Sequence, residues 1–188
     1  MNLETLLSIC LGIGLAASVG FRVFLPLFAL SLAAYFNVLE LNDSWQWIGS
    51  FSALIILGVA TFVEIFAYFI PYVDHLLDGI TVPLAAIAGT IIMLSTVMDL
   101  SPEITWALAI IAGGGTAVAI AGSSSAARLT STISTGGLGN PIVSTVETGT
   151  ATFMAIVSIV LPLIAFVLVI VLFFIIFRVY NKIKKSKG

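Results

Sequence analysis

The sequence predicts an all-α protein, a polytopic bundle of transmembrane helices. Hydrophobic residues make up 60% of the 188 residues and charged residues only 9%, and the mean hydropathy is +1.22. A soluble domain averages about 45–50% apolar and about 25% charged residues, and one soluble core of this size could not bury so much apolar surface. Several apolar runs also reach the roughly 20 residues that a helical span needs. Soluble enzymes and nucleic-acid-binding proteins are therefore excluded, and we expect membrane lipids but no nucleic acid among the partners.

The first apolar segment, residues 6–39, is too long for one ordinary span. As a single straight helix it would measure about 51 Å, against a hydrocarbon core about 30 Å thick. The segment contains Arg22 and Pro26, and proline interrupts helices. We therefore expect a broken helix with its break between Gly20 and Pro26. The sequence leaves open whether this segment crosses the membrane or turns back.

Four further apolar segments are predicted to span the membrane. Residues 48–70, 80–98 and 104–121 have the length of ordinary spans. Residues 148–177 contain no charge but would form a helix of about 45 Å. This last span is expected to tilt, or to bend at Pro162.

Residues 122–147 have a different composition, rich in small and hydroxylated side chains. Thirteen serines and threonines lie between Ser123 and Thr152. The segment is too polar to face lipid, and irregular backbone at membrane depth is tolerated where protein or a water-filled cavity covers it. We therefore expect a polar re-entrant segment that lines a cavity, although serines and threonines can also satisfy their own helix backbone. The candidate binding residues within this segment are Ser124, Thr132, Thr145 and Asn140, the last as a helix cap before Pro141.

The charge distribution predicts the orientation in the membrane. Five of the seven basic residues lie in the tail, residues 178–188. Because basic segments stay in the cytoplasm, we expect a multi-pass protein of the bacterial inner membrane with a cytoplasmic C-terminus. The turns around Glu40 and Asp43 and around Asp99 and Glu103 lack basic residues and are expected outside.

Four charged residues remain within the predicted membrane region, namely Arg22, Glu64, Arg128 and Glu147. A charge at the centre of a bilayer costs at least about 2.5–3.5 kcal/mol, so such groups pair, face water or bind a ligand. Two arginines can hold a carboxylate or phosphate through forked hydrogen bonds, with the glutamates balancing the charge or carrying a proton. The alternative is two structural Arg–Glu pairs that tie helices together.

Two similar stretches surround the arginines. Residues 15–22 and 121–128 are both small-residue segments that end in an arginine, and each is followed later by a glutamate. This pattern indicates a weak internal repeat, as in transporters built from broken helices around a central site.

Asp74 and Asp78 are weaker candidates for binding a divalent ion. Their spacing of four places them on one face of a helix, and paired acids can hold such an ion against a pyrophosphate. The alternative is that they cap the following helix. No catalytic motif accompanies them, and we expect no cofactor.

Four stretches of the chain resemble the bacterial membrane family labelled domain of unknown function 4126. The stretches are GLAASVGFRVFLPL (14–27), EIFAYFIPYVDHLLDGI (64–80), WALAIIAGGG (106–115) and RLTSTISTGGLGNPIVSTVE (128–147). The positions that the resemblance singles out are Arg22, Glu64, Asp74, Asp78, Arg128, Asn140 and Glu147. The resemblance implies a polytopic membrane protein but no activity.

The sequence predicts a small transporter or permease for an anionic or zwitterionic solute or a lipid head group. Arg22 and Arg128 would bind the solute, Glu64 and Glu147 would balance the charge, and the hydroxyl-rich segment would line the path. Because the chain is short for such a machine, we expect a homodimer. The alternatives are an accessory or assembly protein that does not transport, or a metal-dependent lipid-modifying enzyme that uses Asp74 and Asp78.

Overall fold

The computed structural model describes residues 2–186 and confirms the all-α fold class. Eight α-helices, one 3-10 helix and one π-helical turn follow one another, with no strand among these residues. The backbone of this range is described throughout, whereas the side chains of residues 71, 72, 74, 75, 78 and 183–186 lie outside the description. By length and composition four helices could cross a membrane: Gly79–Thr96, Pro102–Thr135, Asn140–Val160 and Pro162–Lys182.

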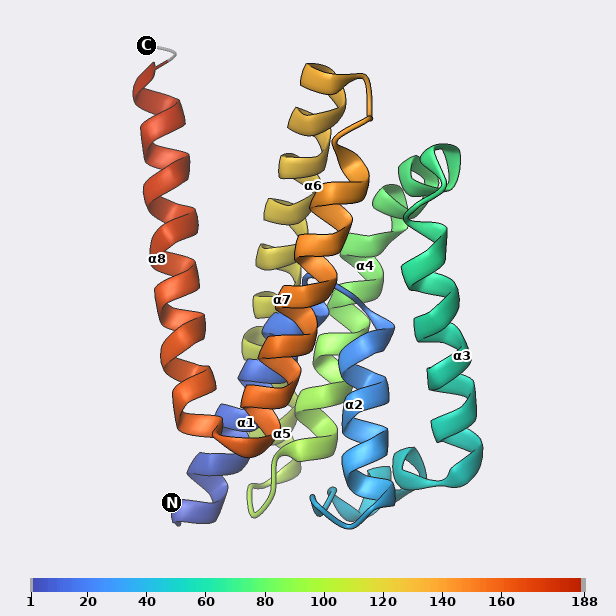
Figure 1. Cartoon of the computed structure of the whole chain (residues 1–188). Helices are drawn as coiled ribbons and strands as arrows, with labels where there is room; N and C mark the ends of the chain where they lie inside the picture. The colour runs from blue at the N-terminus through green and yellow to red at the C-terminus, as the bar shows by residue number, and fades with distance from the viewer. Residues whose placement is uncertain (1, 187–188) are drawn as a thin grey trace.

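The N-terminal segment forms a helical hairpin. α1 (Leu3–Val19) ends at the predicted break and α2 (Phe24–Tyr35) begins five residues later. Pro26 lies in the first turn of α2, where a missing N–H is tolerated. α1 rises from one end of the bundle, and α2 returns to that same end (Figure 1). The segment therefore turns back, and its tip carries Arg22 into the bundle between the other helices.

The next two helices differ in how deeply they are packed. A 3-10 helix, η1 (Asp43–Gly49), meets α3 (Phe51–Ala67) at a bend of 63°, so the two together could form a fifth, broken span. α3 lies at the edge of the bundle against α2 and η1 (Figure 1), with most of its apolar side chains exposed. α4 (Pro71–Thr96) packs against α1 and α6. It begins earlier than the predicted span 80–98, because Pro71 is well placed at a first helical position.

α5 (Pro102–Leu108), the π-helical turn η2 (Ala109–Gly114) and α6 (Gly115–Thr135) run on from one another. Together they would measure about 51 Å, well beyond the predicted span 104–121. η2 crosses α4 where two glycines meet. A Cβ on Gly113 would lie 2.5 Å from the carbonyl oxygen of Gly89, so only glycine permits this approach.

Residues 122–147 differ from the expected irregular re-entrant segment. They form the second half of α6, a turn over residues 136–139 and the start of α7 (Asn140–Val160). Several of the hydroxyls satisfy their own helices, because Ser123, Thr130 and Thr135 each donate to the carbonyl four residues earlier. The expectation of irregular backbone was therefore wrong. The segment that turns back within the bundle is the α1–α2 hairpin.

The predicted last span also divides into two helices. α7 ends at Val160 and α8 (Pro162–Ser186) begins two residues later. The two helices run in opposite directions along the bundle (Figure 1), so Pro162 starts a new helix instead of bending one. α1 lies at the centre, packed on α4, α7 and α8. The N- and C-terminal ends lie at opposite ends of the molecule (Figure 1).

Candidate functional site

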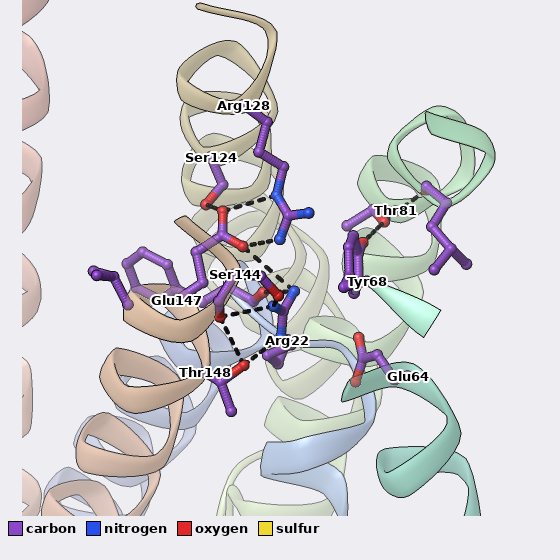
Figure 2. A network of polar contacts seen from close by, with 12 residues as sticks. Arg22, Glu64, Tyr68, Thr81, Ser124, Arg128, Ser144, Glu147 and Thr148 are labelled. Carbon is purple, nitrogen blue, oxygen red and sulfur yellow. Dashed lines mark hydrogen bonds and ion pairs between the residues drawn. The ribbon is translucent and has the colours of Figure 1, made fainter. Parts of the chain in front are cut away.

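Arg22 lies in the turn between α1 and α2 and reaches into the centre of the bundle. Its side chain is fully buried. Nε donates to the Thr148 hydroxyl at 2.9 Å, and Nη2 donates to the Ser144 carbonyl at 2.9 Å and the Ser144 hydroxyl at 2.6 Å (Figure 2). The tip of the hairpin is thus fixed to one turn of α7.

A close approach of backbones positions this turn. A Cβ on Gly20 would lie 2.4 Å from Cβ of Ile120 and 2.9 Å from the carbonyl oxygen of Ala117, both on α6. Real Cβ atoms do not come this close, so any larger residue would push the hairpin tip away from α6. Gly20 therefore allows Arg22 to enter the site.

Glu147 on α7 is the carboxylate that both arginines share. Arg128, buried on α6, donates from Nε to Oε1 at 3.0 Å and from Nη2 to Oε2. Nη1 of Arg22 lies 3.4 Å from the same Oε2, and the Ser124 hydroxyl donates to Oε1 at 2.7 Å. Glu147 thus binds two guanidinium groups from different parts of the chain (Figure 2).

Tyr68, which directly follows α3, covers both guanidinium groups. Cζ of Arg22 lies 4.2 Å and Cζ of Arg128 lies 4.0 Å from the centroid of its ring. These are cation–π distances, and such contacts strengthen where water is excluded. The phenol oxygen lies 2.6 Å from the Thr81 hydroxyl on α4. The aromatic ring therefore joins α3 and α4 to the arginine cluster (Figure 2).

Glu64 binds backbone N–H groups at the start of α2. Its two carboxylate oxygens accept hydrogen bonds from the backbone N–H groups of Val23 at 2.7 Å and Phe24 at 3.0 Å. These N–H groups lie at the N-terminus of α2, where a helix has no internal acceptors for them. Glu64 therefore caps α2 from α3.

The other predicted site residues lie apart from this cluster. Asn140 is the first residue of α7, where Gly139 occupies the cap position. The Asn140 side chain instead donates to the Thr132 hydroxyl at 3.0 Å, across the turn from α6. Thr145 is exposed and donates to the carbonyl of Pro141. The prediction of Asn140 as a cap was therefore wrong.

The acidic pair Asp74 and Asp78 lies in the first turns of α4, and both side chains lie outside the described residues. Among the described residues no group of three or more His, Cys, Asp or Glu side chains could hold a metal ion.

Three side chains of the cluster were missing from the predicted set, namely Tyr68, Ser144 and Thr148. Tyr68 follows Glu64 by four residues, which places both on one face of the helix, and this spacing could have indicated it. Ser144 and Thr148 belong to the hydroxyl-rich run, but thirteen similar residues gave no means of choosing among them.

The cluster lies beside an apolar groove. A cavity of about 330 Å³ opens between α2, α3 and α4, with Glu64, Tyr68 and Thr81 among its lining residues. The arginines, Ser144 and Glu147 are buried behind the Tyr68 ring. Chemically, two guanidinium groups that converge on one carboxylate can hold any planar or tetrahedral anion that takes the place of that carboxylate.

The chain was compared with known families, curated proteins and solved structures. The family model described as a domain of unknown function, DUF4126, matches residues 9–182. Comparisons with curated proteins and with solved structures give no match. The matched range contains the hairpin tip, Tyr68, both arginines and both glutamates of the site. Because the match covers nearly the whole chain, this helical membrane protein belongs to the DUF4126 family.

Proposed function

We propose that this protein is a membrane permease for an anionic or zwitterionic solute, and that Arg22 and Arg128 bind the negative group of that solute. The observation that supports this proposal is the Glu147 carboxylate, which contacts the guanidinium groups of Arg22, at the tip of a helical hairpin, and of Arg128, on α6. Intramembrane charges of this kind are functional candidates by default. Interrupted helices that end at a central site are a common feature of secondary transporters.

Glu147 occupies the position that a bound anion would take. Proton uptake by Glu147 removes its negative charge and weakens its bonds to Arg22 and Arg128, so that a carboxylate or phosphate oxygen can accept those bonds instead. One proton is then carried with each anion, so an anion of charge −2, such as divalent phosphate, still moves net charge across the membrane. Loss of the proton restores the Arg–Glu contacts and favours release of the anion.

The membrane arrangement belongs to the same proposal. The basic end of α8 faces the cytoplasm, as the positive-inside rule requires, and the chain works in the bacterial inner membrane as a homodimer. In detergent and in lipid nanodiscs we expect a particle of twice the protomer mass. A particle of one protomer mass in both media would contradict the homodimer.

The test is anion-dependent charge movement in proteoliposomes. Reconstituted protein is adsorbed on a solid-supported membrane and exposed to jumps of acetate or inorganic phosphate, with choline chloride as the ionic control. We expect a current with at least one of the two anions. Arg22→Lys and Arg128→Lys keep the charge but lose the planar fork. A lost charge-assisted hydrogen bond is worth about 1.5–3 kcal/mol, so each variant should weaken anion affinity by about tenfold or more.

Arg178→Lys is the matched control, because Arg178 is an exposed arginine of α8 far along the chain from the cluster. It should leave the current unchanged. The absence of a response to either anion in protein that remains folded would instead favour the alternative, an accessory or assembly protein whose ion pairs are structural.

A further inference from the structure

The groove beside the site runs along the outer helix of the bundle. α3 contributes Ile56, Val59, Ala60 and Val63 to its wall, and these side chains face α4 residues such as Ile80 and Leu84. Ile56, Val59 and Val63 are each more than half exposed. In a membrane this groove opens sideways into lipid, because α3 lies at the edge of the bundle (Figure 1).

Tyr68 separates the groove from the arginine cluster. It lines the groove while its ring lies against the guanidinium groups of Arg22 and Arg128. Its side-chain hydrogen bond to Thr81 involves another groove residue. If the Tyr68 side chain turned away, it would break one hydrogen bond and two cation–π contacts, and it would join an apolar groove directly to two cationic groups.

The groove has the length of one acyl chain in one leaflet. Ile56 and Tyr68 are twelve residues apart, which corresponds to about 18 Å along the helix. One leaflet contributes about half of the roughly 30 Å hydrocarbon core. Glu64 also lines the groove, but its carboxylate oxygens are bonded to the N–H groups of Val23 and Phe24.

From this geometry we infer that the solute is a single-chain amphiphile with an anionic head group, which enters from the bilayer between α3 and α4. Its chain lies in the groove, and its head group displaces the Tyr68 side chain to reach Arg22 and Arg128. The charge complementarity is between a carboxylate and the two guanidinium groups. This inference rests on the proposed function and narrows its substrate class from any small anion to a lipid-like one.

The experiment uses a photoreactive fatty acid that carries a diazirine and a clickable alkyne, in phosphatidylcholine proteoliposomes that contain the full chain. After illumination, labelled peptides are located by mass spectrometry. We expect the label on α3 and α4 residues of the groove. Oleate should compete for labelling at least tenfold better than methyl oleate, which has the same chain without the charge.

Variants then test the position of the chain. Ala60→Trp fills the groove and should lower labelling at least fivefold. Val63→Trp, at an exposed position of the same wall, provides a second blocking variant if Ala60→Trp does not fold. Ile111→Trp is the control, because Ile111 is exposed on η2 away from the groove.

Each outcome decides between the two proposals. Labelling spread over all lipid-facing helices, equal competition by methyl oleate, or unchanged labelling in both groove variants would overturn the amphiphile inference. If acetate or phosphate currents persist under those outcomes, the permease proposal stands without it. Loss of oleate-sensitive labelling in the groove variants, with acetate or phosphate currents retained, supports the groove as the site of the chain.

Discussion

The Glu64 carboxylate accepts a 2.7 Å hydrogen bond from the backbone N–H of Val23, which lies 41 positions earlier in the chain. Its second oxygen accepts from Phe24 at 3.0 Å. These N–H groups lie in the first turn of α2 inside the bundle, where no water is available to accept their hydrogen bonds. The acid therefore replaces the usual capping side chain at this helix start, which has none of its own.

Replacing Glu64 should destabilise the hairpin. In Glu64→Ala both backbone N–H groups lose their acceptor, and hydrogen bonds to charged groups are worth about 1.5–3 kcal/mol each. Glu64→Gln keeps one side-chain oxygen as an acceptor, so its loss of folding free energy should be about half that of Glu64→Ala. Thermal unfolding in dodecyl maltoside, followed by circular dichroism, measures the difference. Glu4→Ala is the control, since Glu4 is exposed on α1. Equal melting temperatures for Glu4→Ala and Glu64→Ala would contradict the capping role.

Changes at Tyr68 should separate its ring from its hydroxyl. Tyr68→Phe loses only the contact with Thr81 and should cost about 1 kcal/mol of folding free energy. Tyr68→Leu also removes two cation–π contacts, each worth about 0.5–2 kcal/mol. We therefore expect the unfolding temperature to fall from wild type to Tyr68→Phe and again from Tyr68→Phe to Tyr68→Leu. Thr81→Val should match Tyr68→Phe, and a drop for Phe as large as that for Leu would show that the ring contacts with the arginines contribute nothing.

Gly20 should be far less tolerant of an added side chain than Gly122. The Cβ of Gly20→Ala would meet Ile120 and the backbone of α6, and overpacking of this kind costs about 1–3 kcal/mol. Gly122→Ala is the matched control on α6, because a Cβ there meets nothing within 4 Å. Alanine is also the better helix former by about 1 kcal/mol. We expect Gly20→Ala to melt lower than wild type and Gly122→Ala to melt at or above it. A neutral Gly20→Ala would falsify the close approach of the hairpin tip to α6.

The sequence identified the charged members of the site because charge is rare in an apolar chain. It could not identify their partners. Arg22, for example, contacts Glu147, on a helix more than a hundred residues later. Which helices meet depends on tertiary packing, and a single sequence does not record it. Tyr68 was missed for a related reason: its spacing of four from Glu64 is a signal, but only tertiary packing brings its ring to the arginines.

The break in the N-terminal segment was predicted correctly, since Gly20 and Pro26 mark it locally. The irregular backbone expected for residues 122–147 is not found, since most of them are helical. A hydroxyl-rich run looks irregular by composition, yet threonines such as Thr130 and Thr135 donate to their own helix. The division of residues 148–177 into two helices was also missed, because one proline can either bend a helix or begin a new one.

The fold predicts which turns share a side of the membrane. The turn around η1 and the one between α4 and α5 lie at one end of the bundle, whereas the turn between α6 and α7 lies at the end reached by the C-terminus (Figure 1). In a Cys10→Ala background, Ser44→Cys and Ser101→Cys should react with a membrane-impermeant maleimide in intact cells. Leu138→Cys, 86% exposed, should react only after the inner membrane is permeabilised. Labelling of Ser44→Cys and Ser101→Cys on different sides would contradict this topology.

An exchange of charge between Arg128 and Glu147 distinguishes a ligand site from a structural ion pair. Glu147→Ala leaves buried guanidinium groups without their shared carboxylate, and breaking a buried pair costs about 3–5 kcal/mol. The exchange Arg128→Glu with Glu147→Arg restores a pair between α6 and α7, so we expect partial recovery of the monodisperse folded fraction in size-exclusion chromatography. It does not restore two arginines that converge from the hairpin and α6 on one anion, so the acetate or phosphate current should stay absent. Recovery of folding and current together would mean that pairing alone explains these residues, because a ligand that needs both guanidinium groups in their native places could not tolerate the exchange.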